Sequence, residues 1–352
     1  MTETQYNGGS VSLDRARGVM VGLAVGNLLG IVPEGRSRQW ITHRYPDGIR
    51  EITAKPGYPD DDDIAQAIAL AEAAAEGPLD PDDVGRRFWD WAETNGAGMG
   101  GLTGRVLSLY GGSYPQRLMR NRRTGRAREP IGMSIKEASR TAWKNSRYRG
   151  DAGNGAVMRC APIAIRWCRD PVALARNSYL SAVPTHWDRR CGWSCVVLNL
   201  AIARALCGQS INPRELLDAG LEGVRASLPE LERHGVEDRV PRRVAEAVSD
   251  ASAQDIDDLN LDGRSMGYTL LALKVGLVSL WRAQSLERGL RDVVEAGGDT
   301  DTNGAVAGAV LGARFGIEGI PRRWREELAE LRVDRVPMDT YADRLWSAAA
   351  KG

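Results

Sequence analysis

Two stretches of the chain carry glycine at every fourth position, and this spacing is the strongest constraint on the fold. They are Gly18, Gly22, Gly26 and Gly30, and Gly304, Gly308 and Gly312. A four-residue repeat lines one face of an α-helix, and each glycine inside a helix costs about 1 kcal/mol relative to alanine. We expect close backbone contact to offset that cost, so two central helices should pack tightly and bring residues after 30 beside residues before 304. Close packing alone explains the glycines, so they indicate architecture and not function.

Helical periodicity runs through the rest of the 352 residues, and convincing strands are scarce. In residues 62–76, for example, apolar side chains recur on one helical face between initial aspartates and a final Gly77-Pro78. Helices are expected at 12–30, 62–76, 81–93, 135–146, 155–167, 188–207, 214–225, 240–250, 266–281, 285–295, 302–314 and 322–331. The predicted fold class is all-α, a compact multi-helix orthogonal bundle. No change of composition divides residues 12–350, which should form one domain after a flexible N-terminus, residues 1–11.

The charge balance excludes several classes of protein. The chain has 47 Lys plus Arg and 46 Asp plus Glu, a formal net charge of +1, which argues against a generally basic nucleic-acid binder and an acidic tail. The longest apolar run, residues 304–313, is about half the span of a bilayer helix, and the N-terminus lacks a signal-peptide pattern. Five cysteines without a CxxC pair indicate reduced thiols. We expect a cytoplasmic monomer without membrane or nucleic-acid partners.

Residues 111–134 form the least regular stretch and carry six arginines with few apolar residues. The arginines are Arg117, Arg120, Arg122, Arg123, Arg126 and Arg128. Such a segment could contact a phosphate-bearing ligand or a protein partner, but a charged run is more often a solvated loop. We expect a long basic loop or lid.

Three acidic sites carry the candidate chemistry. Residues 60–63 are four consecutive aspartates at the start of a predicted helix, where they repel one another unless a cation neutralises them. Asp299 and Asp301 can point the same way from a loop, with the Thr302 hydroxyl as a further oxygen ligand. Glu34 lies four residues beyond the first glycine repeat. Oxygen ligands without His or Cys nearby suit Mg²⁺, Mn²⁺ or Ca²⁺ better than zinc.

Other interpretations of the acidic residues are weaker or fail on spacing. Residues 60–63 could be a polar turn with one helix cap, and Asp301 or Thr302 could simply cap the last glycine-rich helix. An EF-hand fails because neither 60–63 nor 255–258 has the ligand spacing and central glycine of that loop. An all-α terpene synthase or prenyltransferase would need a DDxxD pattern, but Ile64 stands at its last position.

Six motifs, in this order along the chain, resemble those of the ADP-ribosylglycohydrolases, which include dinitrogenase reductase-activating glycohydrolases and ADP-ribosyl-acceptor hydrolases. The resemblance covers almost the whole chain. The motifs are Gly26-Asn27-Leu28-Leu29-Gly30, similar to GDxxG with an acidic residue four positions on; Asp61-Asp62-Asp63-Ile64, similar to TDDT; residues 151–159, similar to GNGxxMR; Thr185-His186, similar to a TH pair; Ser265-Met266-Gly267-Tyr268, similar to the segment beside adenine; and Gly298-Asp299-Thr300-Asp301-Thr302, similar to GDTDT.

The resemblance implies an all-α globule with a binuclear Mg²⁺ or Mn²⁺ centre at the base of an ADP-ribose cleft. The implied metal ligands are Glu34, Asp61, Asp62, Asp63, Asp299, Asp301 and Thr302. The implied substrate-binding residues are Asn154, Gly155, His186, Tyr268, Gly297 and Gly298, with Tyr268 stacked on adenine. Glu34 and Asp151 are the candidate general acid or base. The competing interpretation of His186 and Tyr268 is that both are ordinary core side chains.

The implied activity is metal-dependent hydrolysis of the glycosidic bond between ADP-ribose and an acceptor, first of all an arginine of a protein. The expected partners are therefore ADP-ribose or an ADP-ribosylated protein. Three departures bear on this expectation, because Asn27 replaces the Asp of GDxxG, while Asp61 and Ile64 replace the two Thr of TDDT. They leave two alternatives open: an ADP-ribose-binding protein with altered catalysis, and a hydrolase of another ADP-ribosyl or nucleotide-sugar compound.

Overall fold

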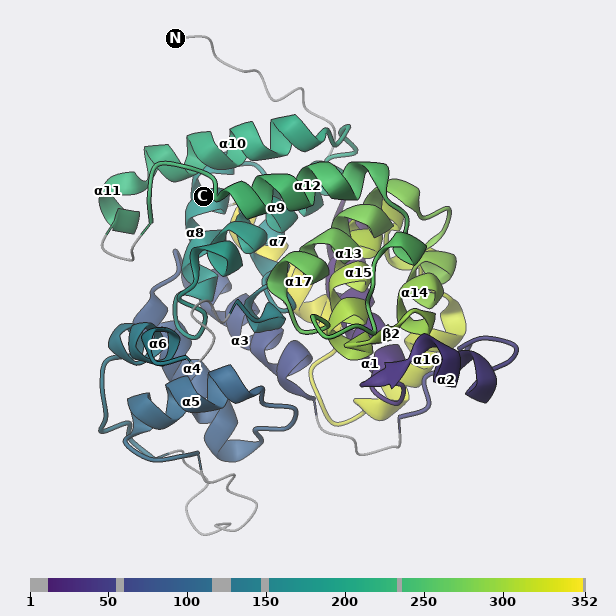
Figure 1. Cartoon of the computed structure of the whole chain (residues 1–352), viewed down its shortest axis with the longest axis horizontal. Helices are drawn as coiled ribbons and strands as arrows, with labels where there is room; N and C mark the ends of the chain where they lie inside the picture. Colours follow the sequence, from purple (N-terminus) through teal and green to yellow (C-terminus); the bar gives the residue numbers. More distant parts are fainter. Residues whose placement is uncertain (1–11, 55–59, 116–127, 147–151, 233–235, 351–352) are drawn as a thin grey trace.

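A computed structural model describes residues 12–54, 60–115, 128–146, 152–232 and 236–350 of the chain, and these residues are almost entirely helical (Figure 1). The α-helices are α1 Leu13–Gly30, α2 Arg38–Arg44, α3 Asp62–Glu76, α4 Pro81–Thr94, α5 Gly101–Gly111, α6 Ile135–Lys144, α7 Pro162–Trp167, α8 Pro171–Ala182, α9 Arg189–Leu206, α10 Pro213–Ala226, α11 Leu228–Leu231, α12 Arg242–Ala253, α13 Thr269–Arg282, α14 Leu286–Glu295, α15 Thr300–Phe315, α16 Arg322–Leu331 and α17 Met338–Ala349. Short 3₁₀ turns are η2 Asn154–Ala156, η4 Ile256–Asp258 and η5 Ile317–Gly319. The all-α prediction is confirmed.

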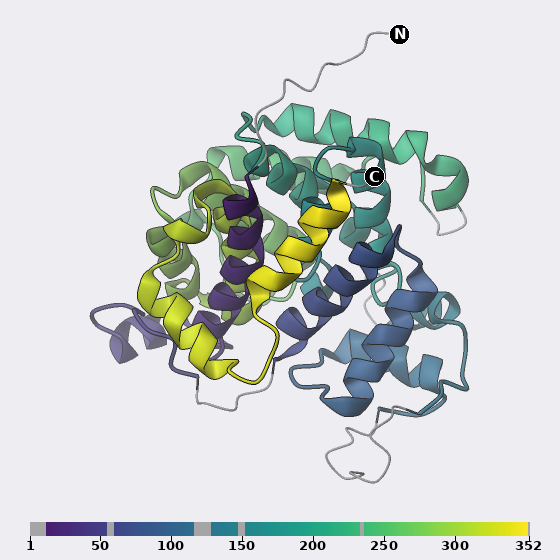
Figure 2. The same ribbon diagram turned by 180° about the vertical axis from the view of Figure 1, so that it is seen from behind.

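The two glycine repeats face each other along the antiparallel helices α1 and α15. A Cβ added at Gly22 would overlap the carbonyl oxygen of Gly308, and one added at Gly26 would overlap that of Gly304. Backbone therefore touches backbone at each turn, which no larger residue permits. Both helices are buried over almost their whole length, and α9, α13, α14 and α17 pack around the pair (Figures 1 and 2). The predicted central helix pair is confirmed.

The pairing continues into the segments that follow α1 and precede α15. The Thr300 hydroxyl donates a 2.6 Å hydrogen bond to the carbonyl of Gly30. Strand β1, Arg36–Ser37, then pairs antiparallel with strand β2, Gly297–Gly298. Both glycines of β2 have positive φ, and a Cβ on Gly298 would overlap the carbonyl of Leu261. The segments after residue 30 and before residue 304 thus lie side by side.

Most predicted helices are present, but the helix predicted at 155–167 is wrong over its first half. The chain there forms the turn η2 and becomes α-helical only from Pro162, because proline has no N–H and is accepted only in the first turn. Helices α2, α5, α8, α11 and α17 were not predicted. Helix α8 had a readable signal, since Asp170 caps the helix by accepting from the Ala173 N–H and Pro171 follows it.

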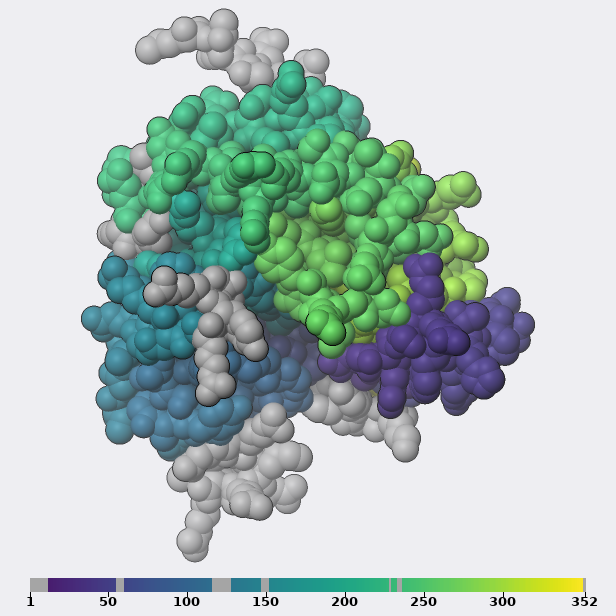
Figure 3. All heavy atoms as spheres, in the orientation of Figure 1, coloured from purple at the N-terminus to yellow at the C-terminus, as the bar shows by residue number. Residues whose placement is uncertain are grey.

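The periphery of the molecule surrounds the ends of the central pair. Helices α4, α5 and α6 gather on one side, and α2, α14 and α16 lie on the other (Figure 1). On one face the purple surface around α2, the blue surface of α4–α6 and the green surface of α12–α13 come together (Figure 3). Within the described ranges, no helix combines the length and apolar character that a membrane crossing requires.

Two sequence-based expectations fall partly or wholly on residues outside the described ranges: the flexible N-terminus, residues 1–11, and most of the arginine-rich loop. Of its six arginines only Arg128 is described, and it is an anchor. Its guanidinium makes a bidentate pair of 2.7 and 2.8 Å with the fully buried Glu93 and lies over the ring of Trp89. Arg128 is therefore attached to α4 through an ion pair and a ring contact.

The glycine contact predicts the cost of a single methyl group. Gly22→Ala should lower the free energy of unfolding by about 2 kcal/mol or more, because the new Cβ must separate two helix backbones. Gly101→Ala, at the exposed start of α5 where a Cβ meets only the end of Arg105, should leave stability unchanged or raise it slightly. Urea unfolding followed by circular dichroism measures both. Equal stability of the Gly22 variant and the wild type would contradict the tight packing.

Candidate metal centre

The four consecutive aspartates at the start of α3 have different environments. Asp60 is neutralised by Arg332, which makes two 2.9 Å hydrogen bonds to its carboxylate, and by Arg335. Asp62 is half-buried and lies against Gly98, where a Cβ would overlap its Oδ1. Asp61 and Asp63 approach the start of α15, where they lie in one group with Asp301. Consecutive residues at the start of a helix point in different directions, so adjacent aspartates have different neighbours.

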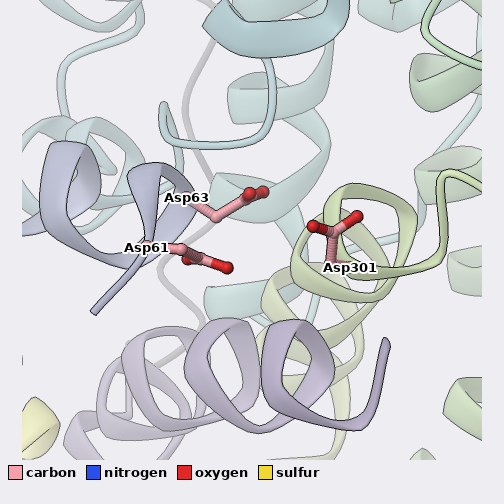
Figure 4. A group of neighbouring side chains, drawn as sticks. All are labelled: Asp61, Asp63 and Asp301. Carbon is pink, nitrogen blue, oxygen red and sulfur yellow. The ribbon is translucent and has the colours of Figure 1, made fainter. Parts of the chain in front are cut away.

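Asp61 and Asp63 meet Asp301 of α15 in a group of three buried carboxylates (Figure 4). One oxygen from each residue lies within 4.8 Å of the others. The side chains are only 4%, 1% and 9% exposed. Among the described residues, Oδ1 of Asp61 and Oδ1 of Asp63 have no hydrogen-bond partner. Buried carboxylate oxygens without partners fit a cation that binds oxygen ligands, so the donor set suits Mg²⁺ or Mn²⁺.

The protonation of this group also favours a cation. Burial raises the pKa of Asp61 to about 6, against a stabilising hydrogen bond from Asn27. The pKa values of Asp63 and Asp301 are raised well above the usual range, first by burial and then by repulsion from Asp61 and Asp299 respectively. Carboxylates this close cannot all be negatively charged without a neutralising group. They must therefore hold protons or a metal ion.

The start of α15 supplies the remaining predicted ligands of this segment. Asp299 accepts a 2.7 Å hydrogen bond from the Asn154 amide. The Thr302 backbone N–H donates to Asp301 at 2.9 Å, while its hydroxyl lies 3.8 Å from the sulfur of Met158. Gly297 and Gly298 form β2 directly before Asp299 and bring it against the turn that follows α1. The GDTDT-like motif therefore places Asp299, Asp301 and Thr302 beside one another at the start of α15.

Glu34 lies at the exposed edge of the same site, in the turn after α1. Its pKa is raised, first by loss of hydration and then by repulsion from Asp299. Its charge in turn raises the pKa values of Asp61 and Asp301. Glu34 is therefore close enough to complete an acidic rim, although it is not one of the three grouped carboxylates.

The turn containing Asn154 and Gly155 connects the acidic residues to His186. Asn154 is held by Asp299 and by the carbonyl of Gly267, which receives its backbone N–H at 3.1 Å. Gly155 lies against the imidazole, since a Cβ there would be 2.9 Å from Cε1 of His186. A glycine is required at this position because the histidine ring occupies the space of a side chain.

His186 is buried and neutral, and its neighbours determine which nitrogen carries the proton. Burial, followed by the charge of Arg159, lowers its pKa to about 3. The wholly buried Arg159 donates a 2.7 Å hydrogen bond to the Thr185 hydroxyl, which lies 2.7 Å from Nδ1 of His186. A guanidinium only donates, so the hydroxyl proton is available for Nδ1. We infer that Nε2 carries the imidazole proton and faces the turn at Gly153 and Gly155.

Tyr268 directly precedes α13 and is partly exposed. Its hydroxyl accepts a 3.1 Å hydrogen bond from Arg190, whose guanidinium also lies 5.6 Å from the ring centroid. An isolated antiparallel bridge joins its backbone to Gly153. The ring is thus fixed beside the Asn154 turn. Asp151, the other candidate acid or base, lies outside the described residues.

A sequence model of the ADP-ribosylglycohydrolase family matches residues 9–352. The chain belongs to the ADP-ribosylglycohydrolase family. The ADP-ribosyl-[dinitrogen reductase] glycohydrolase of Rhodospirillum rubrum is 26% identical over 328 residues, covering 92% of each chain. ADP-ribosylarginine hydrolase Tri1 of Pseudomonas putida (strain GB-1) is 25% identical, covering 90% of this chain and 75% of its own. ADP-ribosylhydrolase ARH3 of Homo sapiens is 25% identical, covering 91% and 90%.

The fold comparison agrees with the family assignment. A solved structure of an ADP-ribosylglycohydrolase-related protein complex superposes with a TM-score of 0.66 at 26% identity, covering 96% of this chain and 98% of that one. Identities near 25% support membership of a family of ADP-ribosyl hydrolases and leave the acceptor open.

Three residues that contact the predicted site residues had no predicted role themselves: Asn27, Gln66 and Arg159. Gln66 accepts a hydrogen bond from Arg159, which connects α3 to the Thr185–His186 pair. Arg159 is the last residue of the segment that resembles GNGxxMR. Its position in that motif could have predicted a role in the site. Asn27 stood out only as a departure from GDxxG. Asn27 and Asp61, two of the three departures from the family motifs, contact each other. The spacing of these residues in the sequence does not suggest this contact.

The raised pKa of Asp61 predicts how stability depends on pH. The folded protein holds this proton up to about pH 6, whereas the unfolded chain releases it at about pH 4. Between these values the folded state binds more protons, so stability falls as pH rises. Metal-free protein should therefore unfold at a higher temperature at about pH 5 than at about pH 7.5. Added Mn²⁺ should stabilise the protein more at the higher pH, because it competes with protons for the same oxygens.

Scanning calorimetry with EDTA or MnCl₂ at both pH values tests this prediction. Replacing Asp61 and Asp301 together by Asn should reduce the pH difference of the metal-free protein and abolish the Mn²⁺ effect. Asp218→Asn, on the exposed face of α10, is the matched control and should retain both. The same pH difference in the double variant would mean that other groups cause it.

Proposed function

We propose that this protein is a metal-dependent hydrolase that cleaves the glycosidic bond between ADP-ribose and an arginine side chain of a protein. The observation that carries the proposal is the buried Asp61, Asp63 and Asp301 group, with unpartnered oxygens, at the junction of α3 and α15. The name of the Pseudomonas relative, an ADP-ribosylarginine hydrolase, favours an arginine acceptor, and that of the Rhodospirillum relative favours a protein substrate. We further propose that it acts as a cytoplasmic monomer without a nucleic-acid partner.

In this proposal the carboxylate group, with Glu34, Asp62, Asp299 and Thr302, holds two Mg²⁺ or Mn²⁺ ions. When bound, the ions supply Lewis acidity toward ribose hydroxyls and a water molecule. The protein contributes the arrangement of negative charge. Carboxylates around the sugar favour the positive charge that develops at the anomeric carbon as the glycosidic bond breaks.

The residues around the Asn154 turn are proposed to bind ADP-ribose. His186 is neutral, so its Nε2–H donates a hydrogen bond to a ribose or diphosphate oxygen at any pH near neutrality. Gly155, Gly297 and Gly298 contribute backbone groups, because their side-chain positions are already filled by His186, by the backbone of residues 36–38 and by the Leu261 carbonyl respectively. The Tyr268 ring stacks on adenine, and its hydrogen bond to Arg190 keeps the ring in place.

Proton transfer is assigned to Glu34 and Asp151. Glu34 is accessible and has a raised pKa, so it is placed to accept a proton from the attacking water. Asp151 is the second candidate, and would protonate the leaving nitrogen if both residues take part. Products are ADP-ribose and an unmodified arginine.

The deciding experiment measures release of ADP-ribose from an arginine-ADP-ribosylated protein in the presence of Mg²⁺ or Mn²⁺. Release by the wild type should require the metal, and the Asp299→Ala plus Asp301→Ala variant should lose at least about a hundredfold in kcat/KM because two acidic groups of the centre are removed. Asp218→Asn should keep full activity. Tight metal-dependent binding of ADP-ribose without release would instead identify a binding protein, the alternative that the departures at residues 27, 61 and 64 keep open.

A second prediction separates the role of His186 from that of the metal centre. Thr185→Val removes the hydroxyl that joins Arg159 to the imidazole, and should weaken ADP-ribose binding on the order of tenfold without changing Mn²⁺ affinity. Ser181→Ala removes a nearby buried hydroxyl that donates to the Ser178 carbonyl within α8, and should change neither value. Isothermal titration calorimetry with each ligand provides the comparison. Unchanged ADP-ribose affinity in Thr185→Val would exclude a binding role for this tautomer.

A further inference from the structure

Asn27 is a wholly buried amide on α1, between the glycine contact with α15 and the acidic group. Its neighbours along the helix, Gly26 and Leu28, are also buried. Its Nδ2 donates a 3.0 Å hydrogen bond to Oδ2 of Asp61. The opposite amide orientation would set a carbonyl oxygen against a carboxylate, so the direction of this bond is determined by the acceptor. A buried polar side chain among the apolar residues 18–30 of the helix needs such a partner.

Asp61 differs from three other aspartates that directly precede helices, and shares this difference with Asp299 before α15. Asp80, Asp170 and Asp188 each turn the side chain back and accept a 2.9–3.0 Å hydrogen bond from a backbone N–H of their own helix. Asp61 has the same place before α3, but its side chain forms no cap hydrogen bond. The carboxylate instead extends toward Asn27 and the acidic group.

The two carboxylate oxygens of Asp61 therefore have different environments. Oδ2 is occupied by the Asn27 amide, and Oδ1 is buried without a partner among the described residues. A carboxylate fixed through one oxygen presents the other in a single direction, which is the arrangement of a metal ligand held by a neighbouring donor. An Asp at residue 27 could not do this, because two ionised carboxylates would face each other across the contact.

We infer that Asn27 is a positioning residue that holds the Asp61 carboxylate as a metal ligand. The inference rests on the metal site of the proposed function. It concerns how Asn27 orients one ligand of that site. Asn27 acts through Asp61 and donates to the carboxylate without adding charge to an already acidic centre. Its effect on metal affinity should accordingly vanish when Asp61 is no longer a carboxylate.

A double-mutant cycle on Mn²⁺ binding tests this coupling, with isothermal titration calorimetry on the full chain and no substrate present. Asn27→Leu keeps the approximate size of the side chain but removes the donor, and should weaken Mn²⁺ binding about tenfold. Asp61→Asn should weaken it at least as much. The double variant should bind no more weakly than Asp61→Asn alone. Independent effects that multiply, or an Asn27→Leu variant within twofold of the wild type, would overturn the inference.

A control variant separates positioning from general loosening of the fold. Asn177 is another buried amide, and its Oδ1 accepts a 2.8 Å hydrogen bond from the Leu79 N–H away from the acidic group. Asn177→Leu should lower thermal stability and leave the Mn²⁺ dissociation constant unchanged. An equal loss of Mn²⁺ affinity in both Asn variants would assign the Asn27 effect to folding and overturn the inference. A wild-type protein that takes up no Mn²⁺ or Mg²⁺ would overturn the metal site itself, a result distinct from a failed cycle.

Discussion

The backbone of α1 lies directly on the backbone of α15, and the position of the acidic group follows from this contact. Glycine at Gly22 and Gly308 removes the side chains that would hold the helix axes apart. Because the helices are antiparallel, the end of α1 reaches the start of α15 and continues into the β1–β2 pairing. Helix α3 begins beside this junction. Residues separated by more than two hundred positions are thus brought together by main-chain packing.

The second constraint is the placement of negative charge in a buried region. The protein neutralises Asp60 with Arg332 and Arg335, and supplies Asn27 as a neutral donor to Asp61. Oδ1 of Asp61 and Oδ1 of Asp63 are left without such partners among the described residues. Burial of unpaired carboxylates is unfavourable, so this arrangement is stable only with protons or a cation in place. The structure therefore separates aspartates that maintain the fold from those that are available to a ligand.

Prediction from sequence succeeded where the physical signal is local. The glycine repeats, the start of α3 at Asp62 and the motif ending at Thr302 all lie within one helix or turn, and each was recognised from spacing. Prediction failed at Pro162, where a helical pattern outweighed the effect of proline, and at α8, where the Asp170-Pro171 signal was overlooked. Both failures also concern local signals, so a local signal is necessary for prediction from sequence but does not guarantee it.

By itself the sequence determined that the chain is helical, that two glycine faces must be buried and that three acidic segments have the composition of a metal site. It could not determine which of four adjacent aspartates face Asp301, because that depends on the angle between α3 and α15. It could not assign Asn27 or Arg159 either, since their partners lie on other helices. Only the tertiary structure decided these points, because hydrogen bonding and desolvation depend on distances between segments that the linear order does not specify.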